Sequence, residues 1–197
     1  ACVTKVLACF WDTKSDSFVF KFDKNLFIKI VKDCEHCPTK RDQCSTIARI
    51  FDVLGLISHF IIRGKMLIQR SFLKELDWDD KVSEKEHKDW MDWLNEIENI
   101  SKLKIPRRFN PVYNLSDCNS IELHTFADAG GEAFAAVCYI VTIVNNERFS
   151  NIVMAKAKIT PLRHKSRTQI SEMPRLELCA CFIGALLADT VFNHFSH

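Results

Sequence analysis

The sequence predicts an α+β protein, in which an N-terminal β-hairpin and a helical connection module precede three antiparallel strands and a long helix. Apolar residues recur at helical spacing in the middle of the chain and again near its end, whereas residues 121–159 hold apolar runs separated by turn residues. A stretch rich in proline and asparagine, residues 102–120, divides the two parts. We therefore place a domain boundary near residue 115, between modules 1–115 and 116–197.

The first module contains a predicted hairpin and three predicted helices. Its expected elements are strands at 6–11 and 17–22, a turn at 12–16, and helices at about 39–51, 58–73 and 84–100. Thr39 precedes the first helix as an N-cap. Ser83 is followed three residues later by Glu86, which is the spacing of a capping box. In the third helix, the apolar residues that share one face are Trp90, Trp93, Leu94 and Ile97.

The second module is expected to contain three sequential strands and one helix. These elements are predicted at 121–128, 133–144 and 149–159 for the strands and at about 174–194 for the helix. Alternation along the first strand puts Leu123, Thr125 and Ala127 on one face and His124, Phe126 and Asp128 on the other. Because neither face is strongly polar, we expect this strand to be well buried.

Composition and charge are those of a globular protein and exclude few functions. Hydrophobic residues make up 47% of the 197 residues, and the formal net charge of +2 neither requires nor excludes a nucleic-acid partner. No uninterrupted apolar run reaches the roughly 18 residues of a membrane span, so no membrane partner is expected. The nine cysteines are odd in number and scattered. This pattern is typical of reduced thiols in an intracellular protein.

Two acidic residues form the strongest candidate for a site. Asp128 ends the first strand of the second module, and Glu177 lies in the first turn of the last helix, after Pro174. Carboxylates on a strand and on a helix packed against it can hold Mg²⁺ or Mn²⁺, as in a ribonuclease H-like nuclease. Each residue also has a structural explanation. Asp128 opens a favourable turn sequence, and Glu177 is favoured by the helix dipole.

Basic residues gather near this acidic pair and form a predicted nucleic-acid-binding surface. The candidates for contacts with phosphate groups are Lys156, Lys158, Arg163, Lys165, Arg167 and Arg175. The alternative explanation is an ordinary solvated loop.

A cysteine cluster raises the question of zinc. Cys34, Cys37 and Cys44, with His36, supply donor types that Zn²⁺ accepts. A retroviral-type zinc knuckle also needs a histidine about four residues after its second cysteine. Residues 40–42 contain none. We therefore expect reduced loop cysteines here and no bound zinc.

The chain resembles the polyprotein of BEL/Pao-type LTR retrotransposons over nearly the full length of the chain. Its motifs occur in the same order as in that family. The matching segments are Val6-Leu-Ala-Cys-Phe-Trp11, Thr39-Lys-Arg41, Ile50-Phe-Asp-Val-Leu-Gly-Leu-Ile57, Leu76-Asp-Trp-Asp79, Ile105-Pro-Arg107, Leu123-His-Thr-Phe-Ala-Asp-Ala129, Ala155-Lys-Ala-Lys158 and Pro174-Arg-Leu-Glu-Leu178. In that family the region is sometimes titled a Pao retrotransposon peptidase. It covers the thumb/connection part of reverse transcriptase and the opening of the ribonuclease H domain.

The resemblance implies a role for each module. Residues 1–115 would be a thumb/connection-like module, and residues 116–197 a truncated ribonuclease H-like domain, since the strand that completes the nuclease triad would follow His197. Asp128 and Glu177 would bind Mg²⁺ or Mn²⁺ during cleavage of the RNA in RNA–DNA hybrids. The remainder of the reverse transcriptase polyprotein would be the partner, and this chain alone would be inactive.

Two other functions stay open. Asp128-Ala-Gly130 is similar to the Asp-Ser/Thr-Gly of aspartic peptidases. However, Ala129 replaces the hydroxyl residue, and long helices are not typical of the nearly all-β retropepsins. The other possibility is a non-catalytic module that binds nucleic acid or a polymerase partner.

Overall fold

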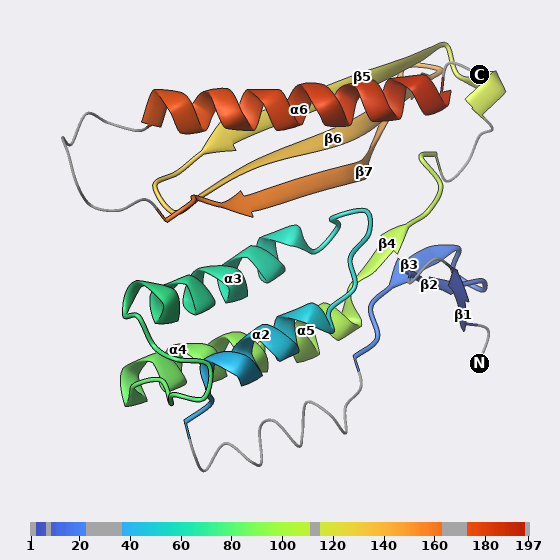
Figure 1. The fold of residues 1–197 in the computed structure, drawn as a ribbon. Coiled ribbons are helices and arrows are strands. Elements are labelled where there is room, and N and C mark those ends of the chain that lie inside the picture. Colours follow the sequence, from blue (N-terminus) through green and yellow to red (C-terminus); the bar gives the residue numbers. More distant parts are fainter. Residues whose placement is uncertain (1–2, 7–8, 23–36, 111–114, 163–172, 196–197) are drawn as a thin grey trace.

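The computed structural model describes residues 3–6, 9–22, 37–110, 115–162 and 173–195. It confirms the α+β class. A small antiparallel sheet and a group of helices form one part, and a three-stranded antiparallel sheet covered by one long helix forms the other. Figure 1 shows the helical group lying along one side of the three-stranded sheet, with the small sheet next to the helices.

The small sheet joins the N-terminus to a segment far away in the sequence. Its strands are β1 (Val3–Val6), β2 (Cys9–Asp12), β3 (Ser17–Val19) and β4 (Lys104–Pro106), in that spatial order. The hairpin of β2 and β3 confirms the predicted one, although its first strand begins at Cys9 and Val6 belongs to β1. The strand β4, which pairs with β3, lies inside the proline- and asparagine-rich stretch 102–120 and was not among the predicted elements.

Two of the four helices in this part begin at the capping residues that the sequence indicated. They are α2 (Lys40–Ala48), α3 (Ser58–Leu73), α4 (Glu84–Asn95) and α5 (Ile97–Lys102). Thr39 caps α2 together with Asp42, and Ser83 caps α4 together with Glu86, so each start has a reciprocal capping box. The single helix predicted at 84–100 is interrupted at Glu96. There the backbone N–H bonds to the carbonyl of Trp93, only three residues back.

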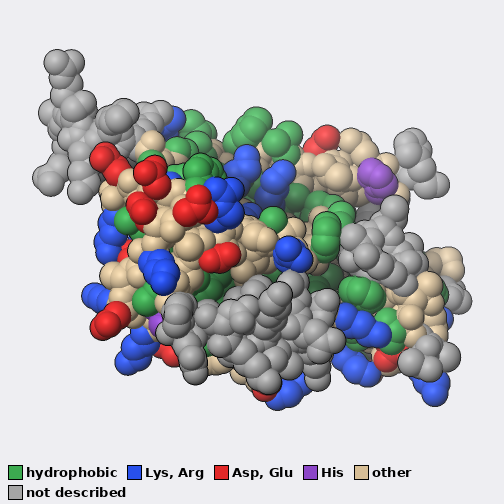
Figure 2. Space-filling view, turned by 60° about the horizontal axis from the view of Figure 1, so that its bottom comes forward, with side chains coloured by type: hydrophobic (Ala, Val, Ile, Leu, Met, Phe, Trp, Pro, Cys, Tyr) green, Lys and Arg blue, Asp and Glu red, His purple; other side chains and the backbone are tan. Residues whose placement is uncertain are grey.

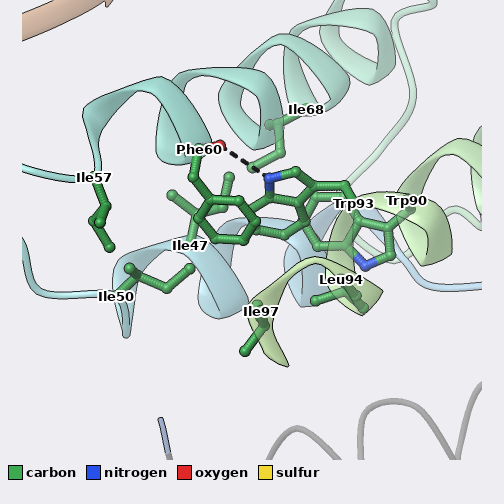
Figure 3. Packing of buried hydrophobic residues seen from close by; sticks show 9 residues of the cluster. All are labelled: Ile47, Ile50, Ile57, Phe60, Ile68, Trp90, Trp93, Leu94 and Ile97. Atoms are coloured by element: carbon green, nitrogen blue, oxygen red, sulfur yellow. Dashed lines mark hydrogen bonds between the residues drawn. The ribbon is translucent and has the colours of Figure 1, made fainter. Parts of the chain in front are cut away.

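Two tryptophans fill the core of the helical group. Trp90 and Trp93 are almost completely buried, and the Trp93 ring stacks on Phe60 with centroids 4.7 Å apart (Figure 3). The Trp93 indole N–H donates to the Phe60 carbonyl oxygen at 2.9 Å, so burial leaves this donor satisfied. Gly64 of α3 lies against the same ring, where a Cβ atom would come within 2.5 Å of a Trp93 ring carbon.

The three-stranded sheet has β6 in its centre. Its strands are β5 (Ser120–Ala129), β6 (Ala133–Val144) and β7 (Glu147–Ile159), and the helix α6 (Met173–Phe195) covers one face (Figure 1). Asn145 and Asn146, both with positive φ, turn the chain between β6 and β7. All four predicted elements are confirmed, with small differences at their ends.

The helix α6 buries one stripe of side chains on the sheet. The stripe consists of Leu176, Ala180, Ile183, Leu187 and Val191, and it packs on Phe134, Ala136, Cys138 and Ile140 of β6. By length and composition alone, residues Met173–His194 could also cross a membrane, a property shared with core helices of soluble proteins. This helix holds no uninterrupted apolar run of that length, because Arg175, Glu177 and Asp189 interrupt it.

The strand β5 is more exposed than its sequence suggested. Ala127 of β5 pairs with Ala136 and lies on the face that α6 covers, whereas Phe126 and Asp128 lie on the opposite face. Phe126 is 58% exposed. The expectation of a well-buried strand was therefore wrong, because among the described residues only one face of the sheet is covered.

The two parts meet at the outer edge of β7. The Ala155 N–H donates to the Leu54 carbonyl oxygen at 2.9 Å, and the Gln69 side chain donates to the Thr160 carbonyl. Gly55 has φ +73°, and a Cβ atom there would lie 1.8 Å from the Ala155 oxygen. Only glycine can follow this path so close to the strand.

Substitution of Gly64 tests the tight packing on Trp93. Replacement of a glycine by alanine inside a helix ordinarily stabilises the folded protein by up to about 1 kcal/mol. For Gly64→Ala we expect the opposite sign, a loss of roughly 1–2 kcal/mol in urea denaturation, because the added methyl overpacks the core. Gly131→Ala is the control, since no atom lies within 4 Å of a Cβ there. Equal effects of the two changes would contradict this packing.

The small sheet should weaken in acid through Asp12. Hydrogen bonds from the Ser15 hydroxyl, the Lys14 backbone and the Lys104 ammonium lower the pKa of Asp12 from its ordinary 3.8 to about 2. Because the folded-state pKa is depressed, the stabilisation is complete above pH 3.8 and lost as the pH falls towards 2. Acid titration followed by the NMR signal of the Trp11 indole N–H, which belongs to the small sheet, measures this loss. Asp12→Asn should flatten the pH dependence in that window, and an unchanged profile would contradict the assignment.

Candidate metal-binding site

Asp128 lies near the end of β5, on the exposed face of the sheet. It pairs with Ala135, which is also exposed, and its Oδ1 accepts a hydrogen bond from the Ala129 N–H at 2.8 Å. This bond holds the carboxylate at the tip of the strand and leaves Oδ2 without a described protein donor. The carboxylate therefore has the solvent access that a metal ligand needs, and it also satisfies the local turn.

Glu177 lies in the first turn of α6 and is exposed. Gly184 lies two helical turns further on, so both residues point to nearly the same side of the helix. At Gly184, α6 approaches Ala127 and Thr125 of β5, with about van der Waals spacing for a Cβ atom. Glu177 is therefore on the flank of α6 that lies over β5.

The structure places the two carboxylates at the same end of the sheet. Figure 1 shows α6 beginning at the end where β5 stops. Strand alternation directs Asp128 to the face that α6 does not cover, so an ion shared with Glu177 would lie at the rim of the sheet. Among the described residues, no group of three or more His, Cys, Asp or Glu could hold a metal ion. The pair matches Mg²⁺ in donor chemistry, but its number of ligands is incomplete.

The predicted phosphate-binding residues do not form one surface with Asp128. Arg175 is exposed in the first turn of α6, two residues before Glu177. Lys156 and Lys158 pair with Ala136 and Phe134, so they lie on the α6 face of the sheet, opposite to Asp128. They border a cleft beside α3, which also holds Lys65. The sequence did not point to Lys65, since only tertiary packing brings α3 to β7.

Part of the predicted basic surface falls outside the described residues. Arg163, Lys165 and Arg167 are in that group. Their role as phosphate contacts stays a prediction from the sequence.

The structure describes only part of the predicted cysteine cluster. Cys34 and His36 are outside the described residues, whereas Cys37 and Cys44 are free thiols. Burial raises the pKa of the Cys44 thiol, which favours the protonated form over the thiolate that Zn²⁺ binds. The expectation that no zinc is bound stays a prediction from the sequence.

A comparison with protein families identifies the chain, while no curated protein and no solved structure matches it. The model described as "Pao retrotransposon-like RNaseH-like domain" matches residues 39–197, well over half of the chain. The match includes the three-stranded sheet, α6 and the helical group, and thus extends across the boundary predicted near residue 115. Its description agrees with the predicted ribonuclease H-like domain, whereas the roles of Asp128 and Glu177 stay a prediction from the sequence. The chain therefore belongs to the Pao retrotransposon-like RNaseH-like domain family.

Proposed function

We propose that this chain is part of a retroelement polymerase polyprotein and carries the first two carboxylates of a ribonuclease H-type site. The complete site would cleave the RNA strand of RNA–DNA hybrids inside the cell. The observation that carries the proposal is the position of Asp128 and Glu177. One ends the first strand of the sheet, and the other begins the helix over that strand, at the same end of the domain.

The two carboxylates would act as oxygen ligands. Mg²⁺ or Mn²⁺, when bound, would supply an activated water and neutralise the charge that develops on the phosphodiester. Asp128 is held by its bond to the Ala129 N–H, and Glu177 by the first turn of α6. We propose that a further carboxylate from the remainder of the polyprotein completes the ligand set, because no group of three or more His, Cys, Asp or Glu side chains among the described residues could hold a metal ion.

A phosphate contact at the start of α6 would come from Arg175. Arg175 lies two residues before Glu177, so its exposed guanidinium points to the opposite side of the helix, and it can bind a phosphate there with two hydrogen bonds. Arg163, Lys165 and Arg167 precede α6 in the sequence and would extend this contact. Lys156 and Lys158 face away from Asp128, and a different partner for them is proposed below.

The chain by itself is expected to bind a metal ion weakly and to cleave nothing. With a labelled RNA–DNA hybrid and Mg²⁺ or Mn²⁺, we expect no cleavage above background. Mn²⁺ titration, followed by the relaxation of water protons, should show weak binding. Asp128→Asn or Glu177→Gln should reduce that affinity at least about tenfold, since the loss of even an outer-shell partner has such an effect.

Asp189→Asn is the matched control, because Asp189 is an exposed carboxylate three turns along α6 from Glu177. Mn²⁺ binding that persists in both the Asp128 and Glu177 variants would refute the metal site. Strong Mg²⁺-dependent hybrid cleavage that Asp128→Asn abolishes would instead overturn the expected inactivity and support the site. Pepstatin-sensitive proteolysis that requires Asp128 would favour the peptidase alternative.

A further inference from the structure

A cleft of about 560 Å³ lies between α3, β7 and α6, on the side of α6 away from β5. Its walls include Ile61 of α3 and Phe182 and Leu186 of α6. Lys156 and Lys158 reach it from β7, and Lys65 from α3. The cleft is thus separate from the rim that holds Asp128 and Glu177, because α6 stands between them.

The cleft carries an excess of positive charge, and its lysine ammonium groups can bind an outside anion. Among the described residues, none of Lys65, Lys156 and Lys158 takes part in an ion pair. Asp52 also lines the cleft, but its carboxylate accepts the backbone N–H groups of Leu56 at 2.8 Å and Ile57 at 2.9 Å. Asp52 is therefore occupied in holding the start of α3, and three ammonium groups remain for an outside anion.

An exposed apolar ridge continues from the wall of the cleft along α6. Leu178, Phe182 and Leu186 recur every four residues and are 69%, 64% and 51% exposed. They span about two helical turns, roughly 12 Å. Val53 adds a side chain that is 62% exposed on the α3 side of the cleft. Figure 2 shows basic side chains next to exposed hydrophobic surface. Apolar residues scattered singly over a surface are normal, whereas a continuous apolar ridge of this kind is typical of an interaction site.

We propose that this cleft binds an amphipathic helix with acidic flanks, contributed by a protein partner. Apolar residues of the partner, at helical spacing, would enter between Ile61 and Phe182. Its carboxylates would meet Lys65, Lys156 and Lys158. An elongated partner fits better than a compact ligand, because the ridge extends beyond the cleft.

Protein fits this surface better than nucleic acid. Single-stranded nucleic acid binds where bases stack on several aromatic rings along a basic path. Among the described residues, the lining contains one aromatic ring, that of Phe182, and the other exposed walls are mainly aliphatic. Aliphatic walls with a few cations complement an acidic amphipathic helix. The inference does not depend on the proposed nuclease function.

The test uses a fluorescent synthetic helical peptide with leucine at every third or fourth position and glutamate on both flanks. Saturable binding to the whole chain, measured by anisotropy and weakened by salt, is the expected result. The double variant Lys156→Glu/Lys158→Glu should lose at least about tenfold in affinity, equal to about 1.4 kcal/mol. It should also gain affinity for the same peptide with lysine in place of glutamate. Phe182→Gln should weaken binding at every salt concentration.

Lys102→Glu is the matched control, because Lys102 is an exposed lysine of α5 outside the cleft lining. The altered side chains in the test variants are exposed, so circular dichroism should show an unchanged fold. Absence of saturable peptide binding would overturn the proposal. Equal losses in the Lys102 and Lys156/Lys158 variants would do the same. Displacement of the peptide by an RNA–DNA hybrid, with the hybrid binding more tightly through Lys156 and Lys158, would assign the cleft to nucleic acid instead.

Discussion

The arrangement of the described structure depends on the contact between the edge of β7 and the segment before α3. A strand edge presents unpaired N–H and C=O groups, and here the Leu54–Gly55 segment covers part of that edge through the bond from the Ala155 N–H to the Leu54 oxygen. Gly55 permits the approach because its backbone has positive φ and no Cβ. Asp52 fixes the same turn by accepting two N–H groups at the start of α3. The helical group is thereby held beside the sheet.

The packing of α6 on the sheet gives the two sides of this helix different surroundings. One side of the helix approaches β5 closely at Gly184, which places Glu177 near the strand that bears Asp128. The other side faces α3 across β7 and contributes Phe182 and Leu186 to a cleft that contains lysines. A single helix thus separates an acidic rim from a basic, apolar cleft. The two surfaces have opposite charge, which is why we propose different partners for them, a hydrated cation on one side and an acidic chain on the other.

The outer edge of β5 contrasts with the covered edge of β7. Among the described residues no strand pairs with it, and the face that carries Phe126 and Asp128 is open. An open edge and an uncovered apolar face are sites where further chain can add, and otherwise they favour aggregation. The same exposure leaves Asp128 accessible to solvent. The proposal that another part of the polyprotein completes the carboxylate set is consistent with this open side.

Local signals in the sequence determined most element boundaries. The helix predicted at 58–73 is α3 itself, and the capping boxes of Thr39 and Ser83 mark where α2 and α4 begin, because such bonds involve residues only three apart. The period-2 pattern assigned Ala127 and Asp128 to opposite faces, as the pairing confirms. The sequence also supplied the family resemblance and both candidate ligands.

Tertiary structure alone decided which distant residues meet. Pairing of β4 with β3 joins residues about 90 positions apart, and no local pattern in Lys104–Pro106 encodes that partner. The exposure of β5, the placement of Lys156 and Lys158 opposite to Asp128, and the approach of Lys65 all depend on how the sheet is covered. Burial and site geometry arise from contacts between elements, whereas periodicity reports only the shape of each element by itself.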